Sequence, residues 1–269
     1  MNPLAYYDPN NPYPESDGQP MAENTEQYDW LVKIKENLEI LFADRADVFV
    51  AGDLLWYPVP DRTVAGPMAP DVMVAFGRPK GRRGAYLQWE EGHIAPQVVF
   101  EVQTPANSRT EMANKRRFYD QYGVEEYYVY DPQRHRLEIY RRQGAHLKRV
   151  THLHGWVSPR LGVRFVLRPD TLELYHPNGE PFLTSVEMAR SIARAEQKIR
   201  EAIAVRQRAA QEAREAAVAR QRPEQEAARA DQEAREAAAA RQRAEQEAAR
   251  ADQEAARAAR LAERLRALG

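Results

Sequence analysis

An apolar run that ends in polar residues constrains this chain more than any other stretch of its sequence. Residues 97–103 read Gln-Val-Val-Phe-Glu-Val-Gln, and successive side chains of a strand point to opposite faces. Glu101 and Gln103 would therefore share one face, while Val98, Phe100 and Val102 share the other. Such a run favours a buried strand, where a carboxylate without a partner is costly. We therefore expect Glu101 to have a metal ion or a cation beside it.

A second acid, Asp71, directly precedes another apolar run, residues 72–76. Two carboxylates on neighbouring strand ends could hold Mg²⁺ or Mn²⁺ through oxygen ligands. Such an ion could activate water and stabilise charge on a phosphodiester. Each acid also has a simpler interpretation: Asp71 could flank its strand, and Glu101 could be solvated on an edge strand.

The remaining pattern predicts an α/β (α+β) chain. Ser108 and Glu111 match a capping box, and Gly123 suits the end of a helix over 109–122. Apolar residues at helical spacing predict another helix from about Glu26 to Phe42. Strands are predicted at 47–51, 53–59, 71–76, 97–103, 126–130, 136–141, 162–167 and 171–175. This order indicates a mixed sheet with helices packed against it.

The last third of the chain is built from repeats. Residues 212–232 recur at 233–253 with two differences, Val218/Ala239 and Pro223/Ala244. Alanine, arginine, glutamate and glutamine all favour helix, so a long helix is predicted from Ser185. Alanine buries little surface, so a coiled-coil seam would be weak. We expect Pro223 to kink or interrupt the helix.

The first turns of this tail carry a modest apolar stripe. Ile192, Ile199 and Ile203 form it, and they allow a weak homodimer. We expect the tail to be dispensable for the fold of the preceding body.

Composition narrows the classes of partner. From Ser185 onward there are 18 basic and 15 acidic residues, which leaves 21 basic and 25 acidic before it. An acidic body argues against tight non-specific DNA binding but allows a local basic groove. No cysteine is present, which fits a reducing cytoplasm. No apolar run approaches the ~20 residues of a membrane span, and the N-terminus is unlike a signal peptide.

Four segments, in this order, resemble the Uma2 family of restriction-endonuclease-like proteins in the PD-(D/E)xK nuclease superfamily. They read APDVMVAFG, VVFEVQTPANS, KRRFYDQYGVEEYYVYDP and LGVRFVLRPDTLELYHPNGEPFLT. The likeness runs from about Thr25 to Thr184. It implies a nuclease-type domain over 23–184, after a loose arm at 1–22 and before a helical tail at 185–269.

The resemblance implies Mg²⁺-dependent (or Mn²⁺-dependent) hydrolysis of DNA, with Asp71 and Glu101 as metal ligands. The superfamily pattern ends in lysine where this chain has Gln103. Gln103 would then complete the ion's shell or orient water. Lys115, on the predicted helix 109–122, is the candidate replacement cation, because a lysine recurs on this helix in the family. Its alternative is an exposed pair with Glu111, worth about 0.2–0.5 kcal/mol.

Two further alternatives remain open. The glycine-rich loop 77–84 carries four cations that could contact phosphates, but a solvated surface loop fits it equally well. The chain as a whole could also keep a nuclease fold without catalysis and serve as a binding or assembly module through its tail. The glutamine at position 103 and the acidic body favour that alternative.

Overall fold

The computed structural model describes residues 13–18 and 20–266 of the 269-residue chain. Residues 1–12 and 19 of the predicted N-terminal arm therefore lie outside the described part. Two compact units are present, the first ending at Ser191 and the second beginning at Ile192. No described helix is both long enough and apolar enough to cross a membrane.

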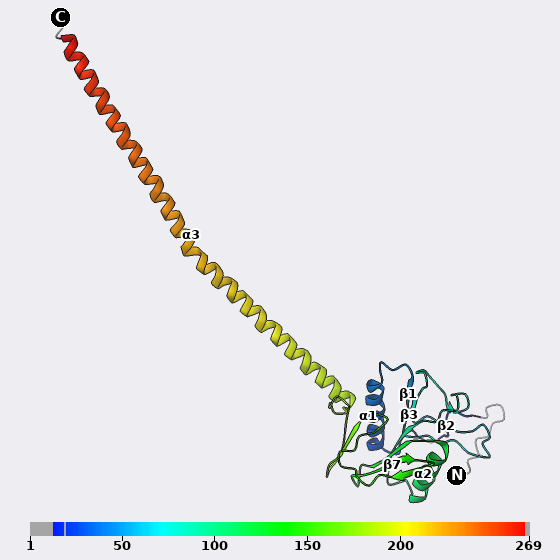
Figure 1. The fold of residues 1–269 in the computed structure, drawn as a ribbon. Helices are drawn as coiled ribbons and strands as arrows, with labels where there is room; N and C mark the ends of the chain where they lie inside the picture. Colours follow the sequence, from blue (N-terminus) through cyan, green and yellow to red (C-terminus); the bar gives the residue numbers. More distant parts are fainter. Residues whose placement is uncertain (1–12, 19, 267–269) are drawn as a thin grey trace. The chain divides into compact units, whose positions relative to one another are not determined.

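Three helices and ten strands make up the described chain (Figure 1). In chain order they are α1 (Thr25–Leu41), β1 (Val48–Gly52), β2 (Trp56–Tyr57), β3 (Val72–Phe76), β4 (Tyr86–Leu87), β5 (Val98–Val102), α2 (Arg109–Tyr122), β6 (Glu126–Asp131), β7 (Arg136–Gln143), β8 (His146–Arg149), β9 (Arg164–Leu167), β10 (Leu172–Tyr175) and α3 (Ser185–Arg266).

A six-stranded mixed sheet in the order β1-β3-β5-β6-β7-β8 forms the centre of the first unit. Strands β5 and β6 run parallel, and the other neighbours in this sheet run antiparallel. The helix α2 connects the two parallel strands, as a parallel pair requires a crossover. The predicted mixed sheet flanked by helices and followed by a long helix is confirmed.

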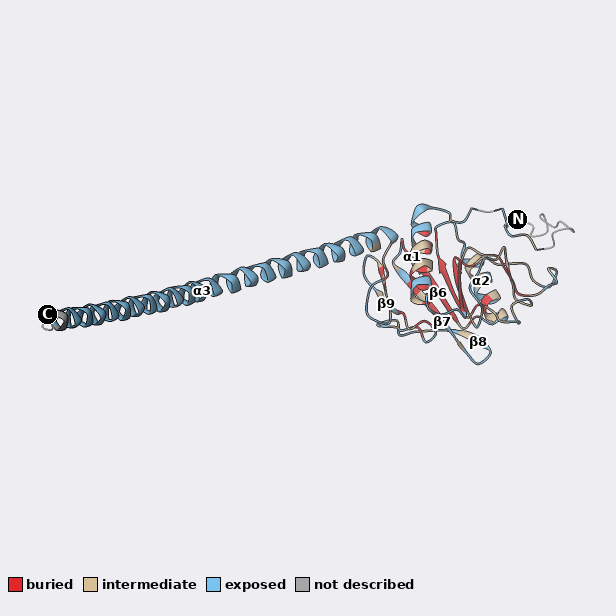
Figure 2. Ribbon diagram, turned by 90° about the horizontal axis from the view of Figure 1, so that it is seen from above, coloured by how far each residue is buried: buried red, intermediate tan, exposed pale blue. Residues whose placement is uncertain are grey.

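Alternation of side chains gives the sheet two buried faces (Figure 2). One face packs against α1 and the β9–β10 hairpin, through residues such as Leu38, Phe100 and Phe165. The other packs against α2, where Tyr119 and Val99 belong to a second core cluster. Val98, Phe100 and Val102 of β5 belong to the first cluster and Val99 to the second, so the odd-numbered residues of β5 face α2. This places Glu101 on the α2 side of the central sheet.

Local signals in the sequence set the bounds of α2. The Ser108 side chain accepts a hydrogen bond from the Glu111 amide at 3.1 Å, and Gly123 takes a left-handed conformation with φ 101°. Only glycine adopts that conformation without steric cost. The predicted helix 109–122 is confirmed residue for residue.

Short strands deviate most from the predictions. The predicted strand 53–59 is reduced to Trp56–Tyr57, which pairs in parallel with β4 in a separate two-stranded sheet. Strands β4 and β8 were not expected, because β4 has two residues and β8 lacks a buried residue. Pro169 and Asp170 lie between the paired strands β9 and β10, where such residues favour a turn.

The repeats form one continuous helix. The segment α3 runs from Ser185 through Pro223 to Arg266, so of the two outcomes expected at Pro223, a kink or an interruption, the interruption is wrong. A proline removes a single backbone hydrogen bond and can be accommodated by bending, and Figure 1 draws a slight bend in the orange part of the helix. Every residue from Ile192 to Glu263 is exposed, including Ile199 at 59% and Ile203 at 51%.

Candidate active site

Glu101 is a buried carboxylate with both oxygens in hydrogen bonds. It lies in β5 and is 3% exposed. Its Oε2 accepts a hydrogen bond from Lys115 Nζ at 2.7 Å, and its Oε1 accepts one from the Tyr119 hydroxyl. The expectation that a cation lies beside Glu101 is therefore met inside the protein.

The spacing of α2 explains why two of its residues reach the same carboxylate. Lys115 and Tyr119 are four residues apart, so they lie one above the other on one face of the helix. That face packs on the sheet, and the Lys115 side chain is only 17% exposed. The ammonium group pairs with Glu101 across the interface, whereas Glu111 accepts instead from Asn107 at 3.0 Å. The structure thus places Lys115 in the buried cluster, not in the exposed pair with Glu111.

Asp71 joins the cluster from the neighbouring strand. It directly precedes β3, which pairs antiparallel with β5, and it is 6% exposed. Its Oδ2 accepts a hydrogen bond from the Val102 amide at 2.6 Å. The Gln27 side chain of α1 donates to Oδ1 at 3.2 Å. Asp71, Glu101 and Lys115 thus come from three separate segments into one buried site.

The charges of these three groups perturb one another. Burial, followed by the charge of Glu101, raises the pKa of Asp71 from 3.8 to about 7, although Lys115 opposes this. Burial lowers the pKa of Lys115, but the charges of Glu101 and Asp71 outweigh it and raise that pKa. Burial and Glu101 also raise the pKa of Tyr119. In this cluster the single positive charge of Lys115 lies beside two carboxylates. With both carboxylates ionised, the three groups would carry a net negative charge.

Two residues of this site were not predicted from sequence. Gln27 was placed in a helix with no further role, yet its amide holds Asp71. Asp53 follows β1 with a positive φ of 48°, and its amide donates to the Asp71 carbonyl at 3.2 Å. Burial and the charge of Asp17 raise the pKa of Asp53 to about 6, with a smaller contribution from Glu101. The only signal in the sequence was Gly-Asp after an apolar run, which any turn shares.

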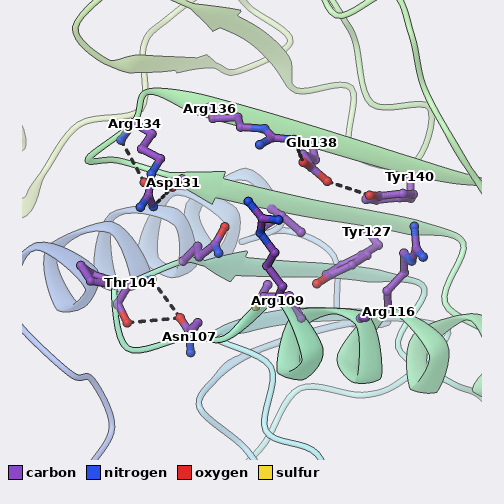
Figure 3. Close-up of a pocket in the computed structure, with 15 residues that line it drawn as sticks. Thr104, Asn107, Arg109, Arg116, Tyr127, Asp131, Arg134, Arg136, Glu138 and Tyr140 are labelled. Carbon is purple, nitrogen blue, oxygen red and sulfur yellow. Dashed lines mark hydrogen bonds and ion pairs between the residues drawn. The ribbon is translucent and has the colours of Figure 1, made fainter.

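Gln103 lies farther along, in a groove beside the cluster. The groove has a volume of about 620 Å³ and lies between α2 and the strands β6 and β7 (Figure 3). The Gln103 amide donates to the Tyr130 carbonyl at 2.7 Å. Among the described residues, its side chain makes no hydrogen bond to Asp71, Glu101 or Lys115. Gln103 therefore faces the groove next to the carboxylates.

The donor set suits a hard cation. Asp71 and Glu101 offer carboxylate oxygens, and Mg²⁺ and Mn²⁺ bind through oxygen, often with one or two carboxylates and several waters. The raised pKa of Asp71 marks a carboxylate pair that an added positive charge would relieve. Within residues 13–18 and 20–266, no three His, Cys, Asp or Glu side chains are grouped closely enough to hold an ion by themselves. The residues present therefore fit an ion that keeps water in its shell.

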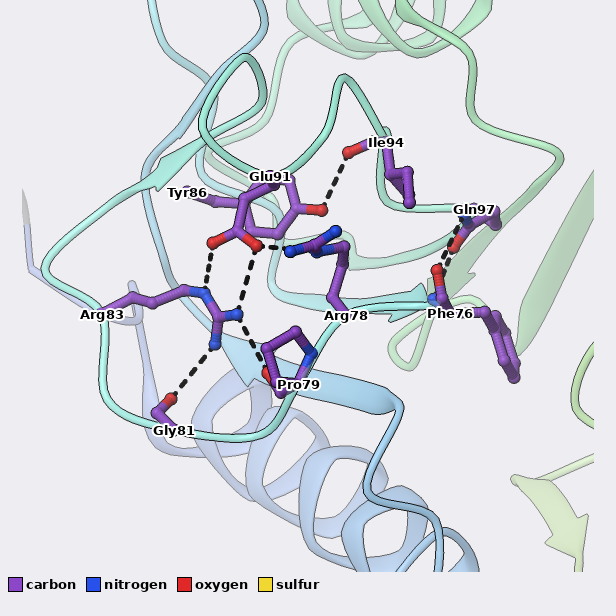
Figure 4. Close-up of polar contacts among 9 residues, drawn as sticks. All are labelled: Phe76, Arg78, Pro79, Gly81, Arg83, Tyr86, Glu91, Ile94 and Gln97. Carbon is purple, nitrogen blue, oxygen red and sulfur yellow. Dashed lines mark hydrogen bonds and ion pairs between the residues drawn. The ribbon is translucent and has the colours of Figure 1, made fainter.

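The basic loop after β3 has structural partners for most of its cations (Figure 4). Arg78 pairs with Glu91 at 2.9 Å, and Arg83 pairs with the same carboxylate at 2.5 Å. Lys80 donates to the carbonyl of Phe42 at 2.6 Å. These contacts fix the loop to the body. They favour the structural interpretation of this loop over phosphate binding.

Asp71 should make the metal-free protein less stable as the pH rises. Its pKa is raised in the folded state, so its contribution to stability is fully present below 3.8 and is lost as the pH rises through about 7. Asp71→Asn keeps an oxygen to accept from Val102 but cannot ionise. In EDTA, we expect the melting temperature of this variant to rise relative to wild type between about pH 4 and about pH 8.

The exposed Asp44 provides the control for this pH series, as Asp44→Asn. A difference between wild type and Asp71→Asn that stays constant with pH would show that Asp71 does not titrate in this range.

Comparison with known proteins finds a family and solved structures that this chain resembles. A family model named Uma2, described as "Putative restriction endonuclease", matches residues 13–168, which is more than half of the chain. A crystal structure described as "a putative nuclease belonging to DUF820", from Anabaena variabilis ATCC 29413, is similar to 54% of this chain over 79% of its own length. It has 14% sequence identity and a TM-score of 0.39. No curated protein matches the sequence.

Proposed function

This chain belongs to the Uma2 family, and on that basis we propose that it is a metal-dependent endonuclease that hydrolyses phosphodiester bonds in DNA. The observation that carries the proposal is the buried contact of 2.7 Å between Lys115 Nζ and Glu101, beside the second carboxylate of Asp71. Metal-dependent phosphodiester hydrolysis uses an anionic site for the divalent ion, and a cation beside the phosphate stabilises the charge that develops.

In this proposal Asp71 and Glu101 bind one Mg²⁺ or Mn²⁺ ion. When bound, that ion lowers the pKa of a coordinated water and neutralises phosphate charge. The Val102 amide and the Gln27 side chain orient the Asp71 carboxylate through hydrogen bonds. Gln103 would complete the shell with its amide oxygen or orient the water, because its side chain lines the adjoining groove.

Lys115 takes the role of the cation in this proposal. Its ammonium group, 2.7 Å from Glu101 Oε2, would offer a positive charge to a phosphate oxygen bound at the site. A fixed positive charge in a water-poor site stabilises the negative charge that develops in the transition state. Glutamine at position 103 cannot supply that charge, so in this proposal Lys115 of α2 supplies it.

The division of the chain forms part of the proposal. Residues 23–184 would make the nuclease-type domain and residues 185–269 a helical tail. The exposure of every residue from Ile192 to Glu263 supports a helical tail that forms a unit of its own. A catalytically inactive module that acts through this tail is the alternative, and Gln103 is the observation that favours it.

The proposal is tested by metal-dependent stabilisation. At a concentration of Mg²⁺ or Mn²⁺ one hundred times its Kd, a ligand of the native state adds about 2.7 kcal/mol, or roughly 5–10 °C in melting temperature for a domain of this size. Glu101→Ala should abolish this increment, measured against the variant's own metal-free transition.

Glu126→Ala is the matched control for this test. Glu126 is a buried glutamate on the neighbouring strand, and it accepts hydrogen bonds from Tyr128, Ser158 and the Arg160 amide. Its variant should keep the full metal response. An equal response in wild type and in Glu101→Ala would remove the metal site.

A further inference from the structure

The groove beside the carboxylates has an unusual concentration of arginine. It lies on the same side of the sheet as Glu101, because its wall includes Val129, which pairs with Glu101 across the two parallel strands. Four arginines line it: Arg109 and Arg116 from α2, Arg134 from the turn after β6 and Arg136 from β7. Figure 3 shows them on both sides of the groove. This is a local basic surface on an acidic body.

Two of these arginines have carboxylate partners within the protein. Arg134 pairs with Asp131 at 3.0 Å, and Arg136 pairs with Glu138. Arg109 and Arg116 make no ion pair among the described residues, and Arg116 lies 5.2 Å from the centre of the Tyr140 ring. Two exposed guanidinium groups on one helix therefore face the groove without a negative partner.

The groove also contains an unsatisfied hydroxyl. Tyr127 lines it and is 1% exposed, and its hydroxyl has no hydrogen-bond partner among the described residues. Figure 3 shows this hydroxyl turned toward the start of α2. Most buried polar atoms have a partner, so an orphaned one needs an explanation. A ligand with an acceptor oxygen, or a water held by that ligand, would supply the missing partner.

We propose that this groove binds the phosphodiester backbone of one nucleic-acid strand and leads it to Glu101 and Lys115. Arg109 and Arg116 contact its phosphates, and the Tyr127 hydroxyl donates a hydrogen bond to the bound strand or to its water. Guanidinium groups recognise phosphate through paired N–H donors. That the bound nucleic acid leads to Glu101 and Lys115 rests on the proposed function. That the groove binds nucleic acid does not.

The test measures binding in EDTA, where a metal-dependent nuclease cannot cleave. The probe is a fluorescein-labelled 20-base-pair DNA duplex, with its single strand for comparison, followed by fluorescence anisotropy. Arg109→Gln with Arg116→Gln should weaken binding at least tenfold at low salt. The slope of log Kd against log salt should also fall by about 1.8, since each phosphate contact contributes about 0.9.

A charge-matched control comes from α2 and β7, which both contribute residues to the groove. Arg117 on α2 and Arg141 on β7 are exposed and do not line the groove. Arg117→Gln with Arg141→Gln should leave both the affinity and the salt slope near wild type. Equal binding by the groove variant and wild type, or the absence of DNA binding by wild type, would overturn the proposal.

Tyr127→Phe separates binding from packing. The change removes an unpaired buried hydroxyl, so the melting temperature should stay the same or rise. Binding of the duplex should nevertheless weaken severalfold. Unchanged binding would exclude the hydroxyl as a contact.

The same variants keep this inference distinct from the proposed reaction. A wild type that binds through the groove but never cleaves would retain the groove and remove the nuclease proposal. If wild type cleaves DNA, and the groove variant binds and cleaves DNA as well as wild type, the nuclease proposal stands and the groove proposal is removed.

Discussion

Lys115→Met is expected to lower the rate of plasmid nicking at least about tenfold, the effect of losing about 1.4 kcal/mol of transition-state stabilisation. Methionine keeps most of the apolar stem of lysine but has no charge. The Glu101 carboxylate would lose the ammonium group that lies 2.7 Å away, and the phosphate would lose its proposed cation. Nicking is measured as conversion of supercoiled to open-circular DNA with Mg²⁺ and with Mn²⁺.

The fold of this variant must be checked, because removing one partner of a buried ion pair is often costly. Circular dichroism and a cooperative melting transition establish that it is folded. Lys33→Met is the matched control, since Lys33 is a partly buried lysine on α1 whose ammonium group lies over the Trp30 ring. If nicking by Lys115→Met equals that of wild type, Lys115 has only a structural role. If wild type never cleaves DNA with either ion, the inactive-module alternative gains.

Truncation of the tail should remove most of the helical signal while the body keeps its unfolding transition. The helix α3 contains 82 residues, against 17 in α1 and 14 in α2. A chain that ends at Ser191 should therefore lose most of its circular dichroism at 222 nm yet melt at the wild-type temperature. The reason is that the residues from Ile192 to Glu263 are all exposed.

A chain that ends at Thr184 tests the boundary itself. Ser185 donates a hydrogen bond to Glu36 at 2.8 Å, and Glu187 caps the start of α3 through the Thr184 amide. Loss of these exposed contacts should lower the melting temperature by no more than a few degrees. Loss of the folded body in either truncation would show that the tail packs on it. Sedimentation of the full chain, compared with the chain that ends at Ser191, tests whether Ile192, Ile199 and Ile203 support a weak dimer.

Local sequence signals predicted several elements of this fold correctly. The bounds of α2 follow from Ser108 and Gly123, which act within a few residues of the helix ends. The long strands β3 and β5 follow from their apolar runs, and placing acids at their ends was enough to bring Asp71 near Glu101. Lys115 was identified because a lysine recurs on this helix in the family that the sequence resembles.

What could not be predicted depends on contacts between distant segments. Gln27 touches Asp71 across 44 residues of sequence, and nothing in its own helix distinguishes it from other polar residues. The orphaned Tyr127 hydroxyl is a property of packing around a single atom. Strand β4 exists because Tyr86 pairs with Trp56, not because of its own pattern. Such features are properties of the assembled sheet.

The solvent exposure of α3 also has a calorimetric consequence. Heat capacity changes on unfolding mainly through newly exposed apolar surface, and an exposed helix of alanine and charged residues hides little of it. The whole chain should therefore melt with a heat-capacity increment near 2.3–2.9 kcal/mol/K, typical of about 190 residues. A heat-capacity increment calculated from all 269 residues would be too large. It would make the curve of unfolding free energy against temperature too steeply curved and would give the wrong temperature of greatest stability.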